Sequence, residues 1–474
     1  MAQKRDSIGE PVRRPCRAAF FRVRSMSRGD QSFAGELRGL LLLSGPIVVN
    51  QLGQVGMTTV DTIMVGPLGA APLAAAGLGS ALHYFGLILT TGVVMGMAPL
   101  VSQAFGRGDV DECGRVLVQG SWLAVLLSVP VLISCLYGRE LSLLLGQEAE
   151  VAALTGGYLE ALALGIPPAL LFVAARQYLE GMGHATATMV VTFLGLGVNV
   201  VANRALIYGV GDWIPALGVA GSGWATTIVR WVMLVAVWVF LGAYRSLQVR
   251  AQRWRPEAVA VRRIFRVGGP VGAQFGLEVG LFSFAAVMMG WLGAVELAAH
   301  QVTINIASTT FMVALGTSMA GSIRVGQHIG GRRPRAVRHA VIATYVLSTG
   351  FMLCCALVFV LAPRSLIGLY TPHEAIIDVG AQLLLVAAAF QLFDGAQVAG
   401  VSVLRGAAET RGPMYVAAIG YWGVGLPIAY LFAFRYGWGP LGVWTGLSIG
   451  LAAVALLLLE RVRRVFWLRR RPGR

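Results

Sequence analysis

The chain has 474 residues, of which 56% are hydrophobic and only 13% are charged. Soluble domains carry about 25% charged residues, so this composition excludes a soluble enzyme, a disordered chain and a small secreted domain held by disulfides. The high apolar content indicates a polytopic all-α membrane protein, and the length leaves room for roughly twelve spans of about 20 residues each.

Residues 1–37 are basic and lack a long apolar run, so they do not have the pattern of a secretory signal peptide. We expect them to form an arm on the cytoplasmic face. The cysteines are too few and too irregular for a disulfide framework or a metal site, so we expect buried thiols. They are Cys16, Cys113, Cys135, Cys354 and Cys355.

Apolar stretches separated by short polar joints follow this arm, and all of them are long enough for a helix to cross a bilayer. Strands of a membrane barrel would be near 10 residues and alternating, a pattern that this sequence does not show. The predicted spans are residues 38–62, 76–101, 115–136, 153–176, 187–209, 217–242, 266–290, 298–323, 338–362, 376–404, 412–434 and 441–460.

The positive charges are distributed very unevenly over the joints. With the N-terminus inside, 33 of the 38 Lys and Arg lie on inside segments and three lie outside, while Arg204 and Arg230 fall within spans. This asymmetry predicts twelve spans with both termini on the cytoplasmic side. The net charge of +16 is then an orientation signal and a contact for anionic lipid, rather than a nucleic-acid interface.

An internal repeat relates residues 45–106 to residues 269–330 without gaps, with 17 identities in 62 positions. The shared residues include Gly45-Pro46 with Gly269-Pro270, Met64 with Met288, Leu68-Gly69-Ala70 with Leu292-Gly293-Ala294, Gln103 with Gln327, and Gly106 with Gly330. The offset spans six helices, an even number, so both halves must cross the membrane in the same sense. This predicts two parallel six-helix repeats around a V-shaped cleft, in which a substrate would bind.

The repeat and the charge pattern together predict the division of the chain. The predicted parts are a basic arm (1–37), an N-lobe (38–242), a cytoplasmic linker (243–265), a C-lobe (266–462) and a basic tail (463–474). We expect the prolines Pro46, Pro270 and Pro427 to lie at kinks or helix ends, where neighbouring groups satisfy the freed carbonyls.

Three acidic residues lie inside otherwise apolar spans: Asp61, Glu278 and Asp394. A charge at the bilayer centre costs on the order of 3 kcal/mol on insertion scales, so such groups are candidates for function. A buried carboxyl group can take up a proton, and an ionised one offers hard oxygen ligands to a metal cation. Each residue is therefore a candidate for cation coupling, and Glu278 with Asp394 is a candidate Na⁺ site.

A structural role is the alternative for these carboxylates, because Arg204 or Arg230 could pair with them as a strut. Asn199 and Asn203 share one face of a helix by their i, i+4 spacing, so with Thr226 they could complete a polar or substrate site beside Asp61. The alternative is an ordinary hydrogen bond between helices. We expect His83 and His300 to be polar packing groups. The chain has no phosphate-binding loop and no nucleophile–base arrangement. We therefore expect that it does not use ATP, needs no cofactor and is not an enzyme.

Residues Pro46 to Gly66, with Asp61 near their end, resemble the first helix of the multidrug and toxic compound extrusion (MATE) family. Further motifs fit the same family over about residues 38–460: Pro99–Gly106, Gly218–Thr226, Arg324–Gln327 and Leu404–Gly406. The resemblance is to the NorM-like branch, and it implies a cation site at Glu278 and Asp394 and an N-lobe site at Asp61 with Asn199. Some members carry a second acid where this chain has Asn203, which favours the C-lobe as the coupling site here.

These observations predict a secondary antiporter, a monomer that exports amphipathic organic cations in exchange for Na⁺ or H⁺ by alternating access. A flippase for lipid-linked saccharides is the alternative, although the acidic residues in the spans disfavour it. A passive channel or a receptor would need no coupling carboxylates. A transporter of the major facilitator type fits the helix count, but the joint at 107–115 has no matching motif.

Overall fold

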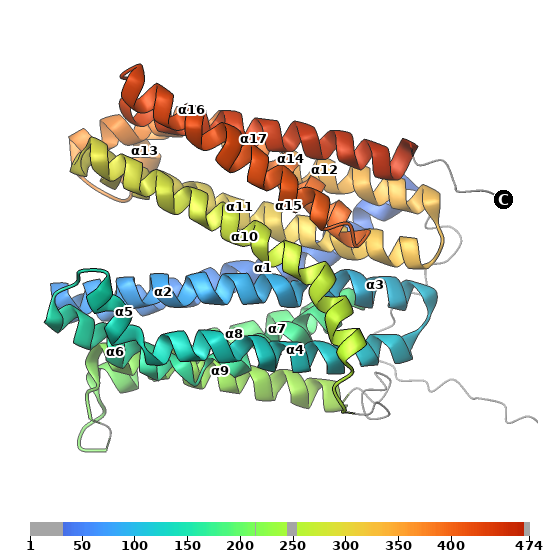
Figure 1. Cartoon of the computed structure of the whole chain (residues 1–474), viewed down its shortest axis with the longest axis horizontal. Coiled ribbons are helices and arrows are strands. Elements are labelled where there is room, and N and C mark those ends of the chain that lie inside the picture. The colour runs from blue at the N-terminus through green and yellow to red at the C-terminus, as the bar shows by residue number, and fades with distance from the viewer. Residues whose placement is uncertain (1–31, 214, 244–253, 469–474) are drawn as a thin grey trace, which may run out of the picture.

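The computed structural model describes residues 32–213, 215–243 and 254–468, and the elements that these residues form are all helices (Figure 1). Most of the predicted arm, the middle of the predicted linker and the end of the predicted tail lie outside the described residues. The helices of the first half are α1 (Phe33–Val65), η2 (Gly66–Leu68), α2 (Ala70–Met95), α3 (Met97–Arg107), α4 (Val110–Leu136), α5 (Gly138–Leu144), α6 (Ala149–Ala163), α7 (Ile166–Gly181), α8 (Ala185–Tyr208) and α9 (Gly218–Ala243). Those of the second half are α10 (Ala258–Leu292), α11 (Ala294–Gly330), α12 (Pro334–Leu361), α13 (Pro363–Gly368), α14 (Glu374–Gly406), α15 (Arg411–Ala417), η5 (Ala418–Gly425), α16 (Leu426–Tyr430), η6 (Leu431–Arg435), α17 (Gly439–Arg463) and η7 (Arg464–Leu468).

Among the described residues, eleven helical segments are long and apolar enough to cross a membrane, and α6 with α7 makes a twelfth. These two helices meet at a bend of 46°, where Gly165 is followed by Ile166 and two prolines. Proline has no N–H group to continue a helix, which accounts for the break within the predicted span 153–176. The chain is therefore a multi-pass membrane protein with the predicted twelve spans.

Helix α10 begins earlier than its predicted span. It starts at Ala258, so residues 258–265 of the predicted linker are helical. The arginines Arg262, Arg263 and Arg266 are exposed in this segment. The predicted span begins only at the last of these arginines because charged residues lower the hydropathy. Arginine is nevertheless a good helix former, so the helix itself extends beyond the apolar stretch.

Helices α1 and α10 each pass from one half of the molecule to the other. The first turns of α1 contact α11, through Glu36 and Arg324, whereas its later turns contact α8, through Gly53 and Thr192. Figure 1 shows α10 starting beside α4 and running across to the helices of the second half. Both helices contain the proline of the repeat, Pro46 in α1 and Pro270 in α10.

One glycine pair of the repeat is explained by the turns that follow these two helices. Gly69 has a φ of 113° and Gly293 a φ of 155°, and each comes directly before the next membrane helix. Side chains with a Cβ disfavour this region. The repeat therefore preserves the turn after the first helix of each half.

The buried side chains form one large cluster in each half and a smaller one between the halves. The smaller cluster joins Leu40 and Ile47 of α1, Met95 of α2 and Val271 of α10 to residues of α11 and α14. The end of the molecule that carries α3 and the end of α17 holds the basic joints, and we call it the predicted cytoplasmic end. At the opposite end, where α5 and α13 lie, the ribbons of the two halves diverge (Figure 1).

Candidate functional site

Asp61 lies in a polar cluster formed by three helices of the first half. Its Oδ1 accepts hydrogen bonds from Nδ2 of Asn199 at 2.9 Å and from Nδ2 of Asn203 at 2.6 Å. Its Oδ2 accepts one from the hydroxyl of Thr226 at 3.3 Å. The structure thus brings together all four residues that the sequence predicts for the site in this half.

The local sequence explains this arrangement. Asn199 and Asn203 are one helical turn apart in α8 and are almost fully buried, at 1% and 0% exposure, so both amides face α1. Their Oδ1 atoms have no hydrogen-bond partner. Two donated amide hydrogens and a hydroxyl are suited to an ionised carboxylate, and the two free amide oxygens leave acceptor capacity beside it.

Arg230 lies near this cluster but does not form an ion pair with Asp61 among the described residues. Its Nη2 is 2.8 Å from Nε2 of His83, while its Nη1 has no hydrogen-bond partner. Asp61 and Tyr158 both interact with it electrostatically. Of the two intramembrane arginines suggested as struts, Arg204 lies instead over the ring of Tyr208 at 5.1 Å.

Glu278 of α10 and Asp394 of α14 form the acidic site of the second half. The two carboxylates interact electrostatically with each other, and both interact with Tyr421. Asp394 is only 6% exposed, and the described residues donate no hydrogen bond to either carboxylate. In contrast to Asp61, these two groups therefore have free oxygens.

Arg405 of α14 places a positive charge beside Glu278. It interacts electrostatically with Glu278 and lies 5.5 Å from the ring centre of Phe275. It is 6% exposed and its Nε has no hydrogen-bond partner. Among the described residues, no group of three or more His, Cys, Asp or Glu is placed to hold a metal ion, so a bound cation would use two carboxylates and neutral oxygens.

The two histidines of the spans have packing partners. Nδ1 of His300 accepts a hydrogen bond from Nε1 of Trp444 at 3.2 Å, and Nδ1 of His83 lies 3.7 Å from Sγ of Cys135. The expectation of buried thiols is confirmed for Cys113 and Cys135, whereas Cys354 is exposed and Cys355 is half-buried. Cys16 lies outside the described residues. Cys354 and Cys355 lie on α12, where the surface of a membrane helix is apolar, so a thiol is tolerated there.

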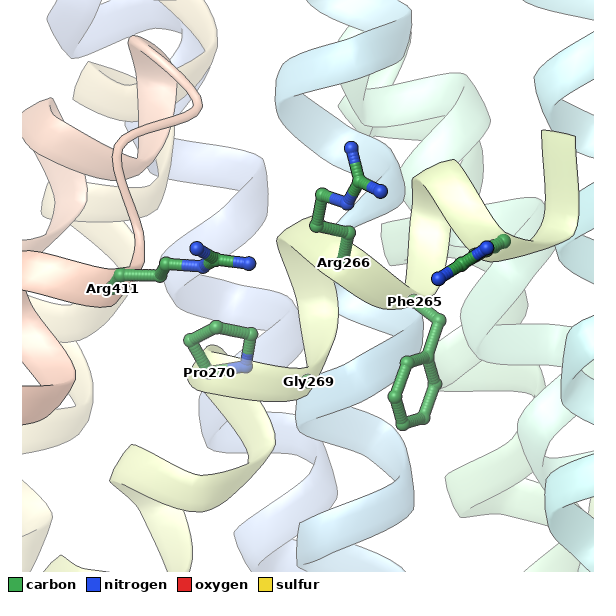
Figure 2. Close-up of a pocket in the computed structure, with 6 residues that line it drawn as sticks. Phe265, Arg266, Gly269, Pro270 and Arg411 are labelled. Carbon is green, nitrogen blue, oxygen red and sulfur yellow. The ribbon is translucent and has the colours of Figure 1, made fainter. Parts of the chain in front are cut away.

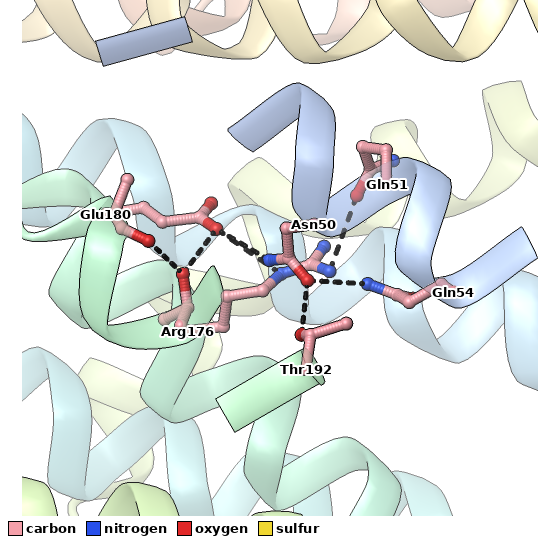
Figure 3. A network of polar contacts seen from close by, with 8 residues as sticks. Asn50, Gln51, Gln54, Arg176, Glu180 and Thr192 are labelled. Carbon is pink, nitrogen blue, oxygen red and sulfur yellow. Dashed lines mark hydrogen bonds and ion pairs between the residues drawn. The ribbon is translucent and has the colours of Figure 1, made fainter. Parts of the chain in front are cut away.

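A buried polar network that the sequence did not predict joins α1, α7 and α8. Nδ2 of Asn50 donates to Oε1 of Glu180 at 3.2 Å, and Thr192 donates to Oδ1 of Asn50 at 2.5 Å (Figure 3). Arg176 and Glu180 are 4% and 1% exposed, with Nε and Oε1 3.8 Å apart. Arg176 is the last residue of the predicted span 153–176 and Glu180 follows it, and charged residues are expected at such a position whether or not they are buried.

A second missed cluster joins α1 to α11 at the predicted cytoplasmic end. Glu36 is 1% exposed, and its carboxylate accepts two hydrogen bonds from Arg324, at 2.7 Å and 2.6 Å. Nε2 of His328 is 2.9 Å from the same carboxylate. Glu36 falls within the predicted arm (1–37), but α1 begins at Phe33 and includes it, and no feature of the sequence pairs it with Arg324.

The glutamines of the repeat also connect the halves at this end. Nε2 of Gln103 donates to the carbonyl of Gly406 at 2.9 Å, and Nε2 of Gln327 donates to the carbonyl of Gly181 at 3.1 Å. Gly106 and Gly330 allow α3 and α11 to cross closely, because a Cβ on either would collide with the backbone of Gln327 or Gln103. The predicted cytoplasmic end is therefore tightly packed.

Comparison with known proteins matches this chain to curated bacterial proteins along most of its length. It is 37% identical over 445 residues to "Probable multidrug resistance protein NorM" of Mesorhizobium japonicum, covering 92% of this chain and 94% of that protein. It is 36% identical over 428 residues to "Multidrug resistance protein NorM" of Burkholderia vietnamiensis, covering 88% and 92%.

Solved structures show the same fold at lower sequence identity. The eukaryotic MATE transporter AtDTX14 superposes with a TM-score of 0.83 at 21% identity, over 91% of this chain and 96% of that one. An outward-facing multidrug resistance MATE family transporter superposes with a TM-score of 0.83 at 22% identity, over 93% and 98%. The MatE family model matches residues 46–204 and 270–431, one stretch in each half of the chain. The chain therefore belongs to the MATE family and is NorM-like.

Proposed function

We propose that this protein is a secondary antiporter that exports amphipathic organic cations in exchange for Na⁺ or H⁺. The observation that carries the proposal is the placement of three carboxylates inside the membrane helices of a NorM-like chain, one in the first half and two in the second. Acidic groups attract a positively charged substrate, and the apolar helices around them suit its lipophilic body. The names of the NorM relatives support a multidrug cargo.

Glu278 and Asp394 are the proposed coupling site. Their oxygens accept no hydrogen bond from the described residues, so a proton or a Na⁺ ion would meet no competing donor. Two carboxylates that interact in a low-dielectric site do not both remain charged without a counter-ion. Arg405 offsets one of the two negative charges, so uptake of one cation would balance the other, and loss of that cation would restore a net negative charge.

Asp61 is proposed to act differently. Its two oxygens already accept three hydrogen bonds, which stabilise the carboxylate as an anion. We propose that it binds the organic cation or a second coupling ion, with Asn199, Asn203 and Thr226 as the polar rim of that site.

Transport by such a protein requires the cation and the cargo to favour different conformations. The hydrogen bonds of Gln103 and Gln327 and the close crossing of α3 and α11 at the predicted cytoplasmic end support a state that is closed on that side and faces outward. In this state a cation from outside would reach Glu278 and Asp394, and the cargo would leave. Reorientation would then require separation of the cytoplasmic contacts around Gln103 and Gln327.

The flippase for lipid-linked saccharides is not favoured. A pyrophosphate headgroup would need a cationic cleft, and the three carboxylates inside the membrane helices disfavour one. Arg230 and Arg405 interact electrostatically with Asp61 and Glu278, respectively, which offset their charge. We also propose that the protein works as a monomer in the inner membrane with both termini cytoplasmic, that it contacts membrane lipids, and that it needs no cofactor beyond the coupling ion.

The test is efflux of a fluorescent lipophilic cation such as ethidium from proteoliposomes that contain the purified protein. An imposed Na⁺ gradient is compared with an imposed pH gradient, each directed to draw the ion in exchange for the dye. The proposal predicts that one of the two gradients accelerates efflux. An efflux rate that neither gradient changes would contradict antiport. Movement of a fluorescent saccharide lipid across the bilayer instead would establish the flippase.

A further inference from the structure

A pocket of about 460 Å³ lies between the first half of α10 and the start of α15, at the predicted cytoplasmic end (Figure 2). Three arginines line it, Arg262 and Arg266 from α10 and Arg411, the first residue of α15. The rest of the lining is apolar and consists of Phe265, Gly269 and Pro270. Neither Asp61 nor the acidic pair of the second half belongs to it.

None of the three arginines forms an ion pair or a hydrogen bond with another described residue. Neighbouring arginines do: Arg263, one residue along α10, lies 2.7 Å from Glu112, and Arg461 lies 3.0 Å from Glu409. Figure 2 shows the side chain of Arg411 extending from α15 toward the turn of α10 that carries Gly269 and Pro270. Three like charges around one concavity repel one another unless an anion lies between them.

The chemistry of the lining indicates a phosphate group. The planar guanidinium group forms paired hydrogen bonds with phosphate oxygens, and three guanidinium groups can surround one such group. Basic pockets between membrane helices on the cytoplasmic side are suited to lipid headgroups. The position of the pocket at the ends of two membrane helices places it at headgroup level.

The apolar side of the pocket distinguishes a lipid from a free anion. Phe265 is 49% exposed, one helical turn from Arg262 and adjacent to Arg266 in sequence. An aromatic ring beside a charged site at the membrane interface can contact the first carbons of an acyl chain. A free phosphate ion would leave this surface uncovered.

We propose that this pocket binds the phosphate of an anionic phospholipid, with Arg262, Arg266 and Arg411 on the headgroup and Phe265 against the acyl region. The site is independent of the three carboxylates and so does not depend on the antiport proposal. A bound lipid would bridge α10 and α15 next to Pro270.

Binding is tested on the full chain in detergent by native mass spectrometry, with cardiolipin, phosphatidylglycerol and phosphatidylcholine titrated separately and with inorganic phosphate as a fourth ligand. The test variant is Arg262→Gln/Arg266→Gln/Arg411→Gln. The matched control, Arg107→Gln/Arg332→Gln/Arg335→Gln, removes the same charge from exposed positions at the same end. The single variant Arg411→Gln tests the contribution of α15 alone.

The proposal predicts that the two anionic lipids bind wild type more tightly than phosphatidylcholine. The triple change in the pocket should weaken their binding on the order of 100-fold and Arg411→Gln about fivefold, since each basic group near the surface contributes about that factor. The control should retain binding close to wild type. Equal losses in the pocket variant and the control, no preference for anionic lipid, or phosphate binding as tight as lipid binding would each overturn the proposal.

Discussion

Gln103 and Gln327 occupy equivalent positions of the repeat and make equivalent hydrogen bonds across the molecule. Gln103 of α3 donates to the carbonyl of Gly406 at the end of α14, and Gln327 of α11 donates to the carbonyl of Gly181 at the end of α7. The last carbonyl groups of a helix have no N–H donor within that helix. Each glutamine therefore donates a hydrogen bond to such a carbonyl in the opposite half. The pair closes the predicted cytoplasmic end symmetrically.

Replacing both glutamines by alanine is expected to favour opening at this end. Each hydrogen bond contributes about 1 kcal/mol, so each change should shift the equilibrium about fivefold and both together about 25-fold if the effects add. Electron–electron double resonance between spin labels at Arg107 and Arg332, in a chain without its native cysteines, measures the population.

Gln147→Ala is the control for this change, because Gln147 is exposed at the opposite end. It should leave the distance distribution unchanged. A double glutamine variant with the same distribution as this control would show that the two hydrogen bonds do not hold the closed state.

Glu36→Gln is expected to destabilise the protein strongly. The change removes the negative charge that faces the guanidinium of Arg324, which is 13% exposed, and breaking a buried pair costs about 3–5 kcal/mol. Thermal unfolding in detergent measures the loss. The double variant Glu36→Gln/Arg324→Gln should lose less than the sum of the single variants, because it removes both charges.

Glu374→Gln provides the comparison for this ion pair. Glu374 also pairs with an arginine, Arg364, at 2.7 Å, but its side chain is 74% exposed. Exposed pairs contribute about 0–1 kcal/mol, so this change should have little effect. Equal destabilisation by Glu36→Gln and Glu374→Gln would contradict a structural role for the buried pair.

Asp61→Asn is expected to lower ion-driven efflux at least tenfold without unfolding the protein. An amide keeps the shape of the side chain but removes the charge to which Asn199, Asn203 and Thr226 donate hydrogen bonds, and charged hydrogen bonds contribute about 1.5–3 kcal/mol. Dye efflux from proteoliposomes measures the loss, and Asp378→Asn is the control because Asp378 is exposed beside Arg364. Unchanged efflux in Asp61→Asn would assign Asp61 to packing alone.

The arrangement of the spans followed from the sequence because it depends on properties that are local along the chain. Apolar length predicts a crossing, and the charge asymmetry predicts its direction. The repeat added the symmetry, and its shared glycines and glutamines proved to mark turns and helix crossings. The break at Gly165 was missed because hydropathy does not report the direction of a helix.

The part of the candidate site that lies on a single helix could be predicted from the sequence. Asn199 and Asn203 share a face by spacing alone, and a carboxylate inside a span is conspicuous. The contacts of Glu36 with Arg324 and of Asn50 with Glu180 were not predictable, because they join residues far apart in sequence at the ends of spans. There, charged residues are expected in any case and only the packing shows which are buried.

Replacing Glu278 or Asp394 by its amide is expected to remove the dependence of dye efflux on the ion gradient. In Glu278→Gln and Asp394→Asn, the site loses the charge that would bind the coupling cation, so efflux should no longer respond to the imposed ion gradient. Passive movement of the dye down its own gradient should remain. An ion response equal to that of wild type in both variants would place the coupling site elsewhere.

The most direct test of antiport is movement of the ion driven by the cargo. Proteoliposomes are prepared with equal Na⁺ and equal pH on both sides, a gradient of the organic cation is imposed, and ²²Na⁺ flux and internal pH are followed for wild type and Glu278→Gln. The account predicts that the cargo gradient drives Na⁺ or H⁺ in the opposite direction in wild type, and that Glu278→Gln abolishes this flux. Cargo movement in wild type with no accompanying movement of either ion would contradict it.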